Sequence, residues 1–512
     1  MSQYDCLVEF KCFAEDKFQP FNARQKQAII MKSLENDIDI EYLEKQGVIL
    51  DHFPMHARDR ELIQKSWDKY KWRLSFGFVF KGFLMNMQPL NFIKDYYGEK
   101  YGFYFAWLIH YTGQLIIPSI LGLIFFIAQI VKREEGESIA KSLNTTENFF
   151  YAIIILIWST YLVESWKRKQ NVIGNQWLVR DFKDSTIERK EFKASSQVDS
   201  TTKEIEKVSV RNSYMYALCI GLPVTGLFML LVCLSQAART YIQMKQYEYY
   251  GDEEVPLQYK YIPSLINAIL ISTFKAIWQI VAKKLTENEN HRYVMDYENQ
   301  LILKMYGFMF VNAYISNILI AFFRQDFTEL QINLMVYLAF KQVGLNVVEY
   351  GILRCWTGRK LKKVDKLFAE RREEVKDDKM KFEYLKTHEI TLQQMAMAKQ
   401  KDTLIFAYNE QFIQLGFIVF FAAAMPLAPL FSFLTNLLEV TIKISSMTQY
   451  TRRFKAEGDS GIGSWLGIME VISMVAIPLN IGVILFTRTP ANKFGSLEDF
   501  DQVPLTEKSA LI

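Results

Sequence analysis

The stretch GFYFAWLIHYTGQLIIPSILGLIFFIAQIV, residues 102–131, decides the fold, because none of its thirty residues is Asp, Glu, Lys or Arg. A bilayer core of roughly 30 Å needs about 20 apolar residues in a helix, so this stretch predicts a membrane-spanning helix. Further apolar runs follow it, separated by charged stretches. The sequence therefore predicts a polytopic membrane protein, although its averages, 50% hydrophobic and 23% charged residues, match those of a soluble domain.

Nine apolar runs predict an all-α bundle of about nine spans. They lie near residues 102–131, 149–166, 213–235, 261–282, 301–323, 328–355, 404–424, 427–446 and 465–486. Basic clusters such as Lys167-Arg168-Lys169 and Lys283-Lys284 follow the even-numbered spans, and positive residues favour the cytosolic side. We therefore expect a cytosolic N-terminus. Residues 167–212 and 357–403, rich in Lys, Glu and Gln, are expected to form polar helices beneath the bilayer.

The chain is expected to have three parts. Residues 1–75 should form a small, shortened cytosolic α+β cap, with a strand near residues 47–50. Residues 76–488 should form the transmembrane domain, and residues 489–512 a polar C-terminal tail. The sequence after Phe486 is polar, so we expect no tenth span. The membrane itself, internal or plasma membrane, is left open by the sequence.

Composition excludes several classes of function. Sixty Lys and Arg against 56 Asp and Glu leave a formal charge of only +4, too little for nucleic-acid binding driven by bulk charge. Five cysteines are too few for a disulfide scaffold, and no His/Cys spacing indicates zinc. The sequence offers no catalytic triad or phosphate-binding loop in a plausible context, so we do not expect an enzyme.

Three acidic residues lie inside predicted spans: Glu349, Glu410 and Glu439 in the sixth, seventh and eighth. An ionisable residue within a membrane is costly and indicates a functional site. Helical rise places all three in the cytosolic third of the bilayer, where clustered carboxylates cannot all stay ionised without a cation. A hard divalent ion bound by oxygens would meet that need, and Asn346, one turn before Glu349, adds a carbonyl.

Lys443 complicates this metal site. It follows Glu439 by four residues, so it lies on the same helix face, one turn nearer the cytosol. Its ammonium can therefore act as a counter-ion to the acids. The alternative is that each acid snorkels or pairs separately, as an ordinary contact within the bundle.

A second set of polar residues lies in the fourth to sixth spans. The fourth span carries a polar stripe within an arc of about 80°, and the full set is Ser264, Ser272, Lys275, Gln279, Asn312, Ser316 and Lys341. Such a stripe could line a groove that lets polar groups cross the bilayer. The alternative is helix–helix packing, which is the better reading for the serines.

Several segments together resemble the anoctamins, a family of calcium-activated chloride channels and phospholipid scramblases. The resemblance covers about residues 20–488. Its strongest segments are Asp95-Tyr96-Tyr97-Gly98-Glu99-Lys100, Leu285-Thr286-Glu287-Asn288-Glu289-Asn290-His291-Arg292, Phe310-Val311-Asn312-Ala313-Tyr314 and Pro426-Leu427-Ala428-Pro429-Leu430-Phe431. The resemblance implies a helical bundle, usually a dimer, in which spans three to seven form a groove facing the membrane.

The resemblance also implies two calcium ions between spans six, seven and eight. Asn346, Glu349, Glu410 and Glu439 stand at ligand positions of that site. Ala407 and Lys443, in contrast, stand where the family has acids. Five carboxylates can hold two calcium ions, but three carboxylates and one lysine carry only −2. We therefore expect at most one calcium ion, weakly bound, or none.

Three functions follow from these residues. The first is a phospholipid scramblase with an accompanying ion leak, whose calcium dependence is weak or absent because Lys443 replaces an ion. The second is a chloride or other anion channel in which Lys275 and Lys341 line the pathway. The third is an inactive structural or tethering protein. The expected partners are membrane phospholipids and small ions, and a homodimer if surfaces other than a tenth span support it.

Overall fold

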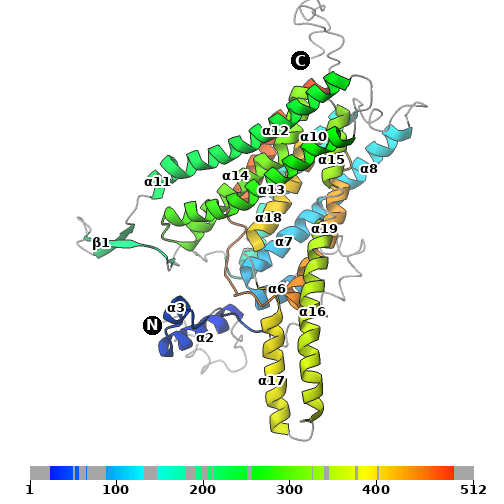
Figure 1. The fold of residues 1–512 in the computed structure, drawn as a ribbon. Coiled ribbons are helices and arrows are strands. Elements are labelled where there is room, and N and C mark those ends of the chain that lie inside the picture. The colour runs from blue at the N-terminus through cyan, green and yellow to red at the C-terminus, as the bar shows by residue number, and fades with distance from the viewer. Residues whose placement is uncertain are drawn as a thin grey trace, which may run out of the picture.

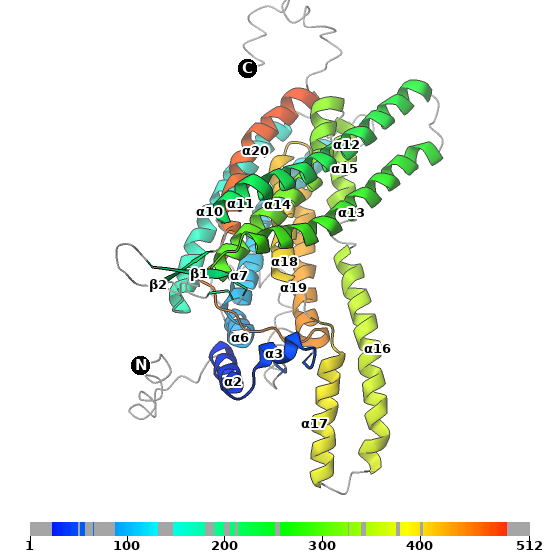
Figure 2. The ribbon, with the colours of Figure 1, turned by 60° about the vertical axis from the view of Figure 1, so that its left-hand side comes forward.

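The computed structural model describes the part of the chain that contains most of the predicted spans. The described residues are 23–49, 52–56, 65, 88–131, 147–179, 188–189, 191–198, 205–209, 213–250, 257–325, 327–338, 345–374, 379–399 and 403–488. Helices account for most of them, arranged as a bundle with a long helical hairpin at one end (Figures 1 and 2).

The α-helices follow the chain in this order: α2 (Ala23–Asp37), α3 (Ile40–Lys45), α6 (Gln88–Tyr97), α7 (Glu99–Gln114), α8 (Ile116–Val131), α10 (Glu147–Gln176), α11 (Ser213–Tyr216), α12 (Leu222–Tyr250), α13 (Leu257–Asn288), α14 (Val294–Leu319), α15 (Phe327–Val336), α16 (Leu345–Glu374), α17 (Lys379–Ala396), α18 (Thr403–Phe420), α19 (Ala428–Ser445) and α20 (Trp465–Arg488). Among the π-helical turns whose full bounds are described, three continue longer helices: η2 (Ala217–Gly221), η3 (Ile320–Arg324) and η5 (Ser446–Tyr450).

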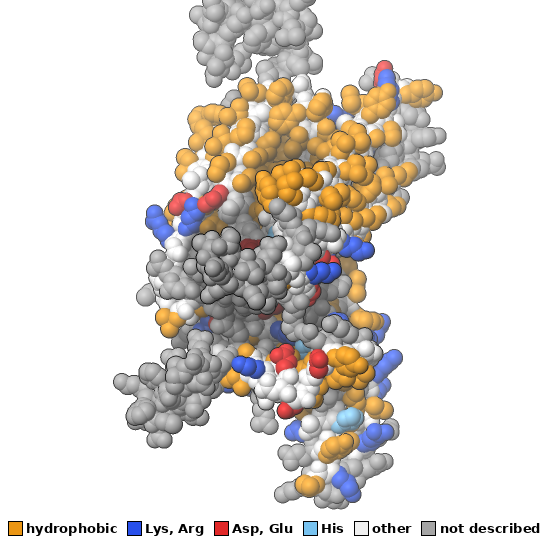
Figure 3. Space-filling view, turned by 90° about the vertical axis from the view of Figure 1, so that its left-hand side faces the viewer, with side chains coloured by type: hydrophobic (Ala, Val, Ile, Leu, Met, Phe, Trp, Pro, Cys, Tyr) orange, Lys and Arg blue, Asp and Glu red, His pale blue; other side chains and the backbone are white. Residues whose placement is uncertain are grey.

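Five helical segments among the described residues are long and apolar enough to cross a membrane. They are Glu99–Val131, Asn148–Gln176, Ser213–Gln246, Val294–Arg324 and Trp465–Phe486, and Leu404–Phe420 is a shorter apolar helix. The chain is therefore a multi-pass membrane protein. Hydrophobic side chains form a broad band over the bundle, and charged side chains gather below it (Figure 3). The remaining predicted spans fall on α13, α15 with α16, and α19, so the count of nine stays a prediction.

The expected strand near residues 47–50 is wrong for the residues described there. Gly47 has a φ of +72°, and the Val48 and Ile49 amides both donate to the Leu43 carbonyl at 2.9 and 3.2 Å. A left-handed glycine with amides returning to the last helical carbonyls is a helix end. The described N-terminal residues therefore contain helices α2 and α3 and no strand, unlike the expected α+β cap.

The expected polar helix over residues 167–212 is also wrong in part. Helix α10 does continue to Gln176, but β1 (Ala194–Val198) and β2 (Ile205–Ser209) then form an antiparallel pair. Six of the ten strand residues are Ser, Val or Ile, which are poorer helix formers than Ala, Leu, Glu or Lys, and the β-branched Val and Ile pack well on a pleated ladder. Helices α16 and α17 confirm the helical prediction for most of residues 357–403.

Helix α18 is the centre of the bundle and is buried along most of its length. Phe412 stacks between Trp107 and Trp465, with ring centroids 5.3 and 5.2 Å away, and Trp107 meets Trp166 edge-on at 5.2 Å. Each such pair contributes about 0.5–1.5 kcal/mol beyond the area buried. This aromatic column joins α7, α10, α18 and α20, so it fixes the helix that carries Glu410.

Helices α16 and α17 form a hairpin that extends away from the bundle (Figures 1 and 2). Within the hairpin, Arg372 pairs with Glu389 at 2.8 Å, and the amide of Gln393 donates to Asp365 at 2.8 Å. At its base, the hydroxyls of Tyr350 and Ser445 lie 2.9 Å apart. The hairpin is therefore attached to the end of α19, the helix that also carries Glu439.

Candidate functional site

Glu439 lies inside the bundle, between α7, α18 and α19. It is only 5% exposed. The hydroxyl of Tyr104 donates a hydrogen bond to its Oε1 at 3.0 Å, and Nε2 of Gln411 donates to its Oε2. Both carboxylate oxygens are therefore satisfied by neutral donors. The sequence placed Glu439 correctly in the bundle, but it did not predict either donor.

The other predicted acids lie differently. Glu410 is exposed on α18, within electrostatic range of Glu439. Asn346 and Glu349 belong to the first turns of α16, and their side chains lie outside the described part of the structure. Among the side chains that are described, no group of three or more His, Cys, Asp or Glu could hold a metal ion. The predicted calcium site therefore stays a prediction.

Ala407 and Lys443, predicted at the two lost acid positions, line the same cavity. The cavity has a volume of about 80 Å³. Its lining comes from α7, α18, α19, η5 and the segment after η5: Tyr101, Tyr104, Leu404, Ala407, Lys443, Ser446, Met447, Thr451 and Phe454. The methyl group of Ala407 and the ammonium of Lys443 provide no oxygen that could bind a metal ion. At these two positions the structure thus places no carboxylate oxygen of the kind that calcium prefers.

Lys443 interacts with Glu439 electrostatically. Within the described part of the chain, however, it closes no ion pair with a carboxylate, because the Glu439 oxygens are taken by Tyr104 and Gln411. The structure is thus compatible with the prediction that Glu439 and Lys443 lie on one face of α19. The proposed counter-ion effect of Lys443 on Glu439 would be a longer-range electrostatic attraction rather than a salt bridge.

Four of the predicted groove residues have described side chains. Lys275 and Gln279 on α13, and Asn312 and Ser316 on α14, are all half-buried. The Oδ1 atom of Asn312 is buried without a hydrogen-bond partner. The side chains of Ser264 and Ser272, and the whole of Lys341, lie outside the described residues. The groove lining therefore stays a prediction.

A polar link between α14 and α15 was not predicted from the sequence. Nδ2 of Asn333 donates to Oδ1 of Asn317 at 2.8 Å, and Asn317 is only 2% exposed. Nearby, Arg324 pairs with Glu329, which joins η3 to α15. Asn317 directly follows Ser316. Its position next to the predicted polar residues Asn312 and Ser316 was the sequence feature that could have indicated this link.

The segment 52–56 contacts one of the residues that line the cavity. The backbone N–H of His56 donates to the side-chain oxygen of Gln394 at 2.7 Å, and its ring Nε2 lies 2.9 Å from the carbonyl of Thr451, which lines the cavity. Its Nδ1 lies 2.9 Å from the hydroxyl of Tyr96. Arg453 donates to the carbonyl of Tyr96 at 2.9 Å. The segment therefore joins α6, α17 and the end of η5.

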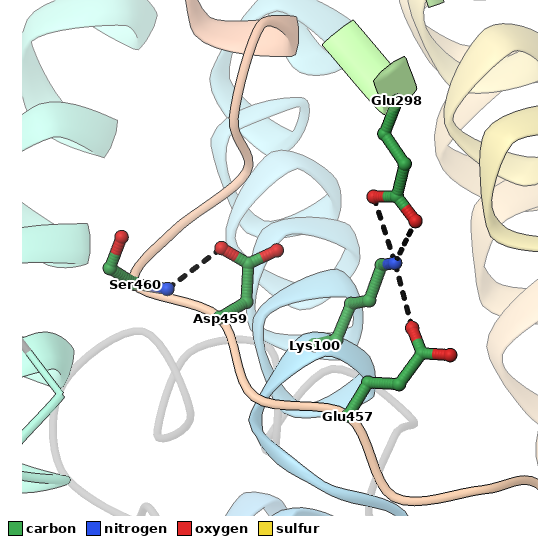
Figure 4. A network of polar contacts seen from close by, with 5 residues as sticks. All are labelled: Lys100, Glu298, Glu457, Asp459 and Ser460. Carbon is green, nitrogen blue, oxygen red and sulfur yellow. Dashed lines mark hydrogen bonds and ion pairs between the residues drawn. The ribbon is translucent and has the colours of Figure 1, made fainter. Parts of the chain in front are cut away.

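A charged network joins the starts of α7 and α14 (Figure 4). The Lys100 ammonium lies 2.7 and 2.9 Å from the Glu298 carboxylate oxygens and 2.8 Å from Glu457. Close by, Oδ1 of Asp459 accepts from the Ser460 amide at 2.7 Å. Because a lysine occupies the centre of this acidic group, the network is a structural link between α7, α14 and the segment before α20.

A buried ion pair fixes the turn between α13 and α14. Glu289 is 0% exposed, and its carboxylate lies 2.9 Å from both the Lys304 ammonium and the ring of His291. Burial alone would raise the pKa of the Glu289 carboxyl, but hydrogen bonds from His291 and Lys304 outweigh it and hold this pKa below its ordinary value. The turn is therefore built around an ionised carboxylate.

Asn290, in the same turn, attaches the β-hairpin. Its side chain accepts from the Lys193 amide and donates to the Lys193 carbonyl, both at 2.9 Å, and it donates to the Ser209 hydroxyl at 2.8 Å. Asn290 has a φ of +56°, a left-handed conformation that asparagine tolerates better than most residues. The hairpin is therefore attached to the turn between α13 and α14.

Known proteins match most of this chain. A family model described as "Anoctamin: Calcium-activated chloride channel" matches residues 93–503. The chain is 28% identical over 458 residues to Anoctamin-10 of Mus musculus, covering 86% of this chain and 62% of that protein. It is 26% identical over 516 residues to Anoctamin-3 of Mus musculus, covering 86% and 49%. The chain thus spans about half to three fifths of the length of the curated relatives it matches.

Proposed function

The chain belongs to the anoctamin family, and from that premise we propose that it is a phospholipid scramblase with an accompanying ion leak whose activity does not require calcium. The proposed groove is formed by spans three to seven. Lipid headgroups would slide along its polar residues while the acyl tails stay in the bilayer. No covalent chemistry is needed, so the proposed function is transport rather than catalysis.

One observation carries the calcium-independent part of the proposal. Ala407 and Lys443, which replace two acids, line one cavity beside Glu439. Calcium prefers six to eight oxygen ligands, and this arrangement supplies an ammonium where it needs oxygens. Calcium would supply positive charge between the acids if it bound there. We propose that the Lys443 ammonium supplies part of that charge permanently, which favours the ion-bound position of α16.

The half-buried polar residues on α13 and α14 support the transport part of the proposal. Lys275 and Gln279 lie four residues apart on α13, and Asn312 and Ser316 lie four apart on α14. Residues at this spacing share a helix face. A buried, unpaired amide oxygen such as that of Asn312 is costly in a bilayer. Water or a lipid headgroup in the groove would satisfy it.

We expect purified protein in liposomes to scramble fluorescent phospholipids at the same rate in a calcium chelator and in calcium. The physical reason is that the lysine charge is present under both conditions. The measurement is the loss of fluorescence when an impermeant reductant is added outside the vesicles, with protein-free liposomes as the control. A rate that rises steeply with calcium would overturn the proposal.

The second candidate is an anion channel, favoured by the family model's description as a chloride channel and by Lys275 on α13. Reversal potentials under a chloride gradient, measured beside the lipid assay, separate the two functions. A scramblase with a leak should move lipid and discriminate weakly between ions. A channel should give a potential near that of chloride without lipid transport. No transport in either assay would favour an inactive tethering protein instead.

A further inference from the structure

Four buried polar side chains on α7, α18 and α19 carry atoms that the described residues leave without a hydrogen bond. Tyr111, Ser432 and Asn436 are 0% exposed, and Gln411 is 1% exposed. The unpaired atoms are the two hydroxyls, Oε1 of Gln411 and both amide atoms of Asn436. Exchanging the oxygen and nitrogen of the Asn436 amide changes nothing, because neither atom has a partner. Buried polar atoms are normally paired, so this group indicates a bound ion or water.

Helices α7 and α19 run antiparallel where these side chains lie. The hydroxyl of Tyr97, two residues before α7, donates to the Met447 carbonyl at 3.0 Å. Seven residues later, the hydroxyl of Tyr104 donates to Glu439 at 3.0 Å. Tyr111 follows after seven more residues, so it lies about 10 Å further into the bundle. It is still within electrostatic range of the Glu439 carboxylate.

The unpaired atoms of α18 and α19 lie at a similar depth. Ser432 is seven residues before Glu439 on the antiparallel helix, which brings it to the level of Tyr111. Asn436 lies between Ser432 and Glu439, and this spacing places all three on one face of α19. From α18, Nε2 of Gln411 donates to Glu439, so its unpaired Oε1 lies beside the same face. We call this region, lined by Tyr111, Gln411, Ser432 and Asn436, the interior seam.

The chemistry of the interior seam suits a cation of single charge. Amide and hydroxyl oxygens can replace water around such an ion, as carbonyl oxygens do in potassium channels. Both oxygens of Glu439 already accept from Tyr104 and Gln411, so this carboxylate supplies negative potential rather than ligands. Lys443 offsets part of that charge from the cytosolic side. A divalent ion usually takes carboxylates among its ligands, and water alone would leave the charge unchanged.

We propose that the interior seam binds an alkali cation, sodium or potassium. Its ligands would be the side-chain oxygens of Tyr111, Gln411, Ser432 and Asn436, and a water on the ion would accept from the Asn436 amide nitrogen. The site lies on the opposite side of Glu439 from Lys443, because Asn436 precedes Glu439 in α19 and Lys443 follows it. It is therefore separate from the predicted calcium site. The proposal does not depend on lipid transport.

The test is the thermal stability of the detergent-purified full chain in a divalent-ion chelator, with sodium, potassium or N-methylglucamine chloride at equal ionic strength. A ligand that binds only the folded state raises the melting temperature. We expect sodium or potassium to raise it by several degrees over N-methylglucamine, a bulky organic cation, and the rise should saturate with concentration. Asn436→Leu should remove this difference. Equal melting temperatures in the three salts would overturn the proposal and leave water as the partner of these atoms.

Two further variants keep the test decisive. Ser432→Ala removes one oxygen with little change in volume, so it should raise the cation concentration that gives half the effect several-fold, even if Asn436→Leu does not fold. Asn333→Leu is the matched control, because that amide donates to Asn317 on α14, away from the interior seam. It should lower the melting temperature yet keep the difference between cations. The proposal is overturned if Ser432→Ala keeps the parent's concentration dependence, or if Asn333→Leu removes the difference.

Discussion

Replacing Ala407 by Glu together with Lys443 by Asp is expected to make lipid scrambling depend on calcium. The two changes restore acids at positions that line one cavity beside Glu439, and they change the charge of the predicted site from −2 to −5. Five carboxylates can balance two calcium ions, so the variant should lose activity in chelator and regain it in calcium. The ratio of the two rates should be at least about tenfold, or ~1.4 kcal/mol of coupling between calcium and the active state.

A matched variant separates a restored site from a change in overall charge. Ala369→Glu with Lys362→Asp alters charge by the same amount on the exposed face of α16. This control should scramble equally in chelator and calcium, as the parent chain does. If the Ala407→Glu, Lys443→Asp variant folds and is also indifferent to calcium, these two positions do not determine calcium dependence.

Replacing Glu289 by Gln is expected to cause the largest loss of stability. Glu289 is fully buried, and its carboxylate lies 2.9 Å from the Lys304 ammonium. Removing one member of a buried pair leaves the other charge uncompensated, which costs about 3–5 kcal/mol. The melting temperature in detergent should fall by many degrees. Glu287→Gln, an exposed residue in the same turn, should leave it nearly unchanged, and equal effects of the two variants would contradict the buried-pair interpretation.

The same pair predicts a dependence on pH. Because the pKa of Glu289 is lower in the folded protein than its ordinary value of 4.5, the ionised carboxylate stabilises the fold above that value. Its contribution should be lost as the pH falls below about 4.5 towards the folded-state pKa. The difference in melting temperature between the parent chain and Glu289→Gln should therefore shrink in acid. A difference that stays constant from pH 7 down to about pH 3 would contradict this assignment.

The helical framework could be predicted from the sequence because each apolar run of membrane length dictates its own helix. Residues 102–131 are an example, and they form α7 and α8. The buried position of Glu439 followed from the same reasoning. The strand expected near residues 47–50 was wrong because Gly47 adopts a left-handed conformation that ends a helix there. The helix expected over part of residues 167–212 was wrong because a segment with serine and β-branched residues forms a β-hairpin instead.

The partners within the site could not be predicted, because they come from different helices. Tyr104 reaches Glu439 from 335 positions earlier in the chain, and no spacing rule connects them. Gln411 directly follows Glu410, so an amide beside an acid was a usable signal for that donor. That Ala407 and Lys443 share a cavity depends on how α18 packs against α19, which only the three-dimensional structure provides.

With Ala407 and Lys443 in place of two acids, we propose that the site has too little negative charge and too few oxygens for the family's two calcium ions. The number of calcium ions bound per chain tests this proposal most directly. Equilibrium dialysis of the purified protein with radioactive calcium measures this number without reference to transport. We predict at most one ion, weakly bound. Two tightly bound ions per chain, lost when Glu439 is replaced by Gln, would contradict the account.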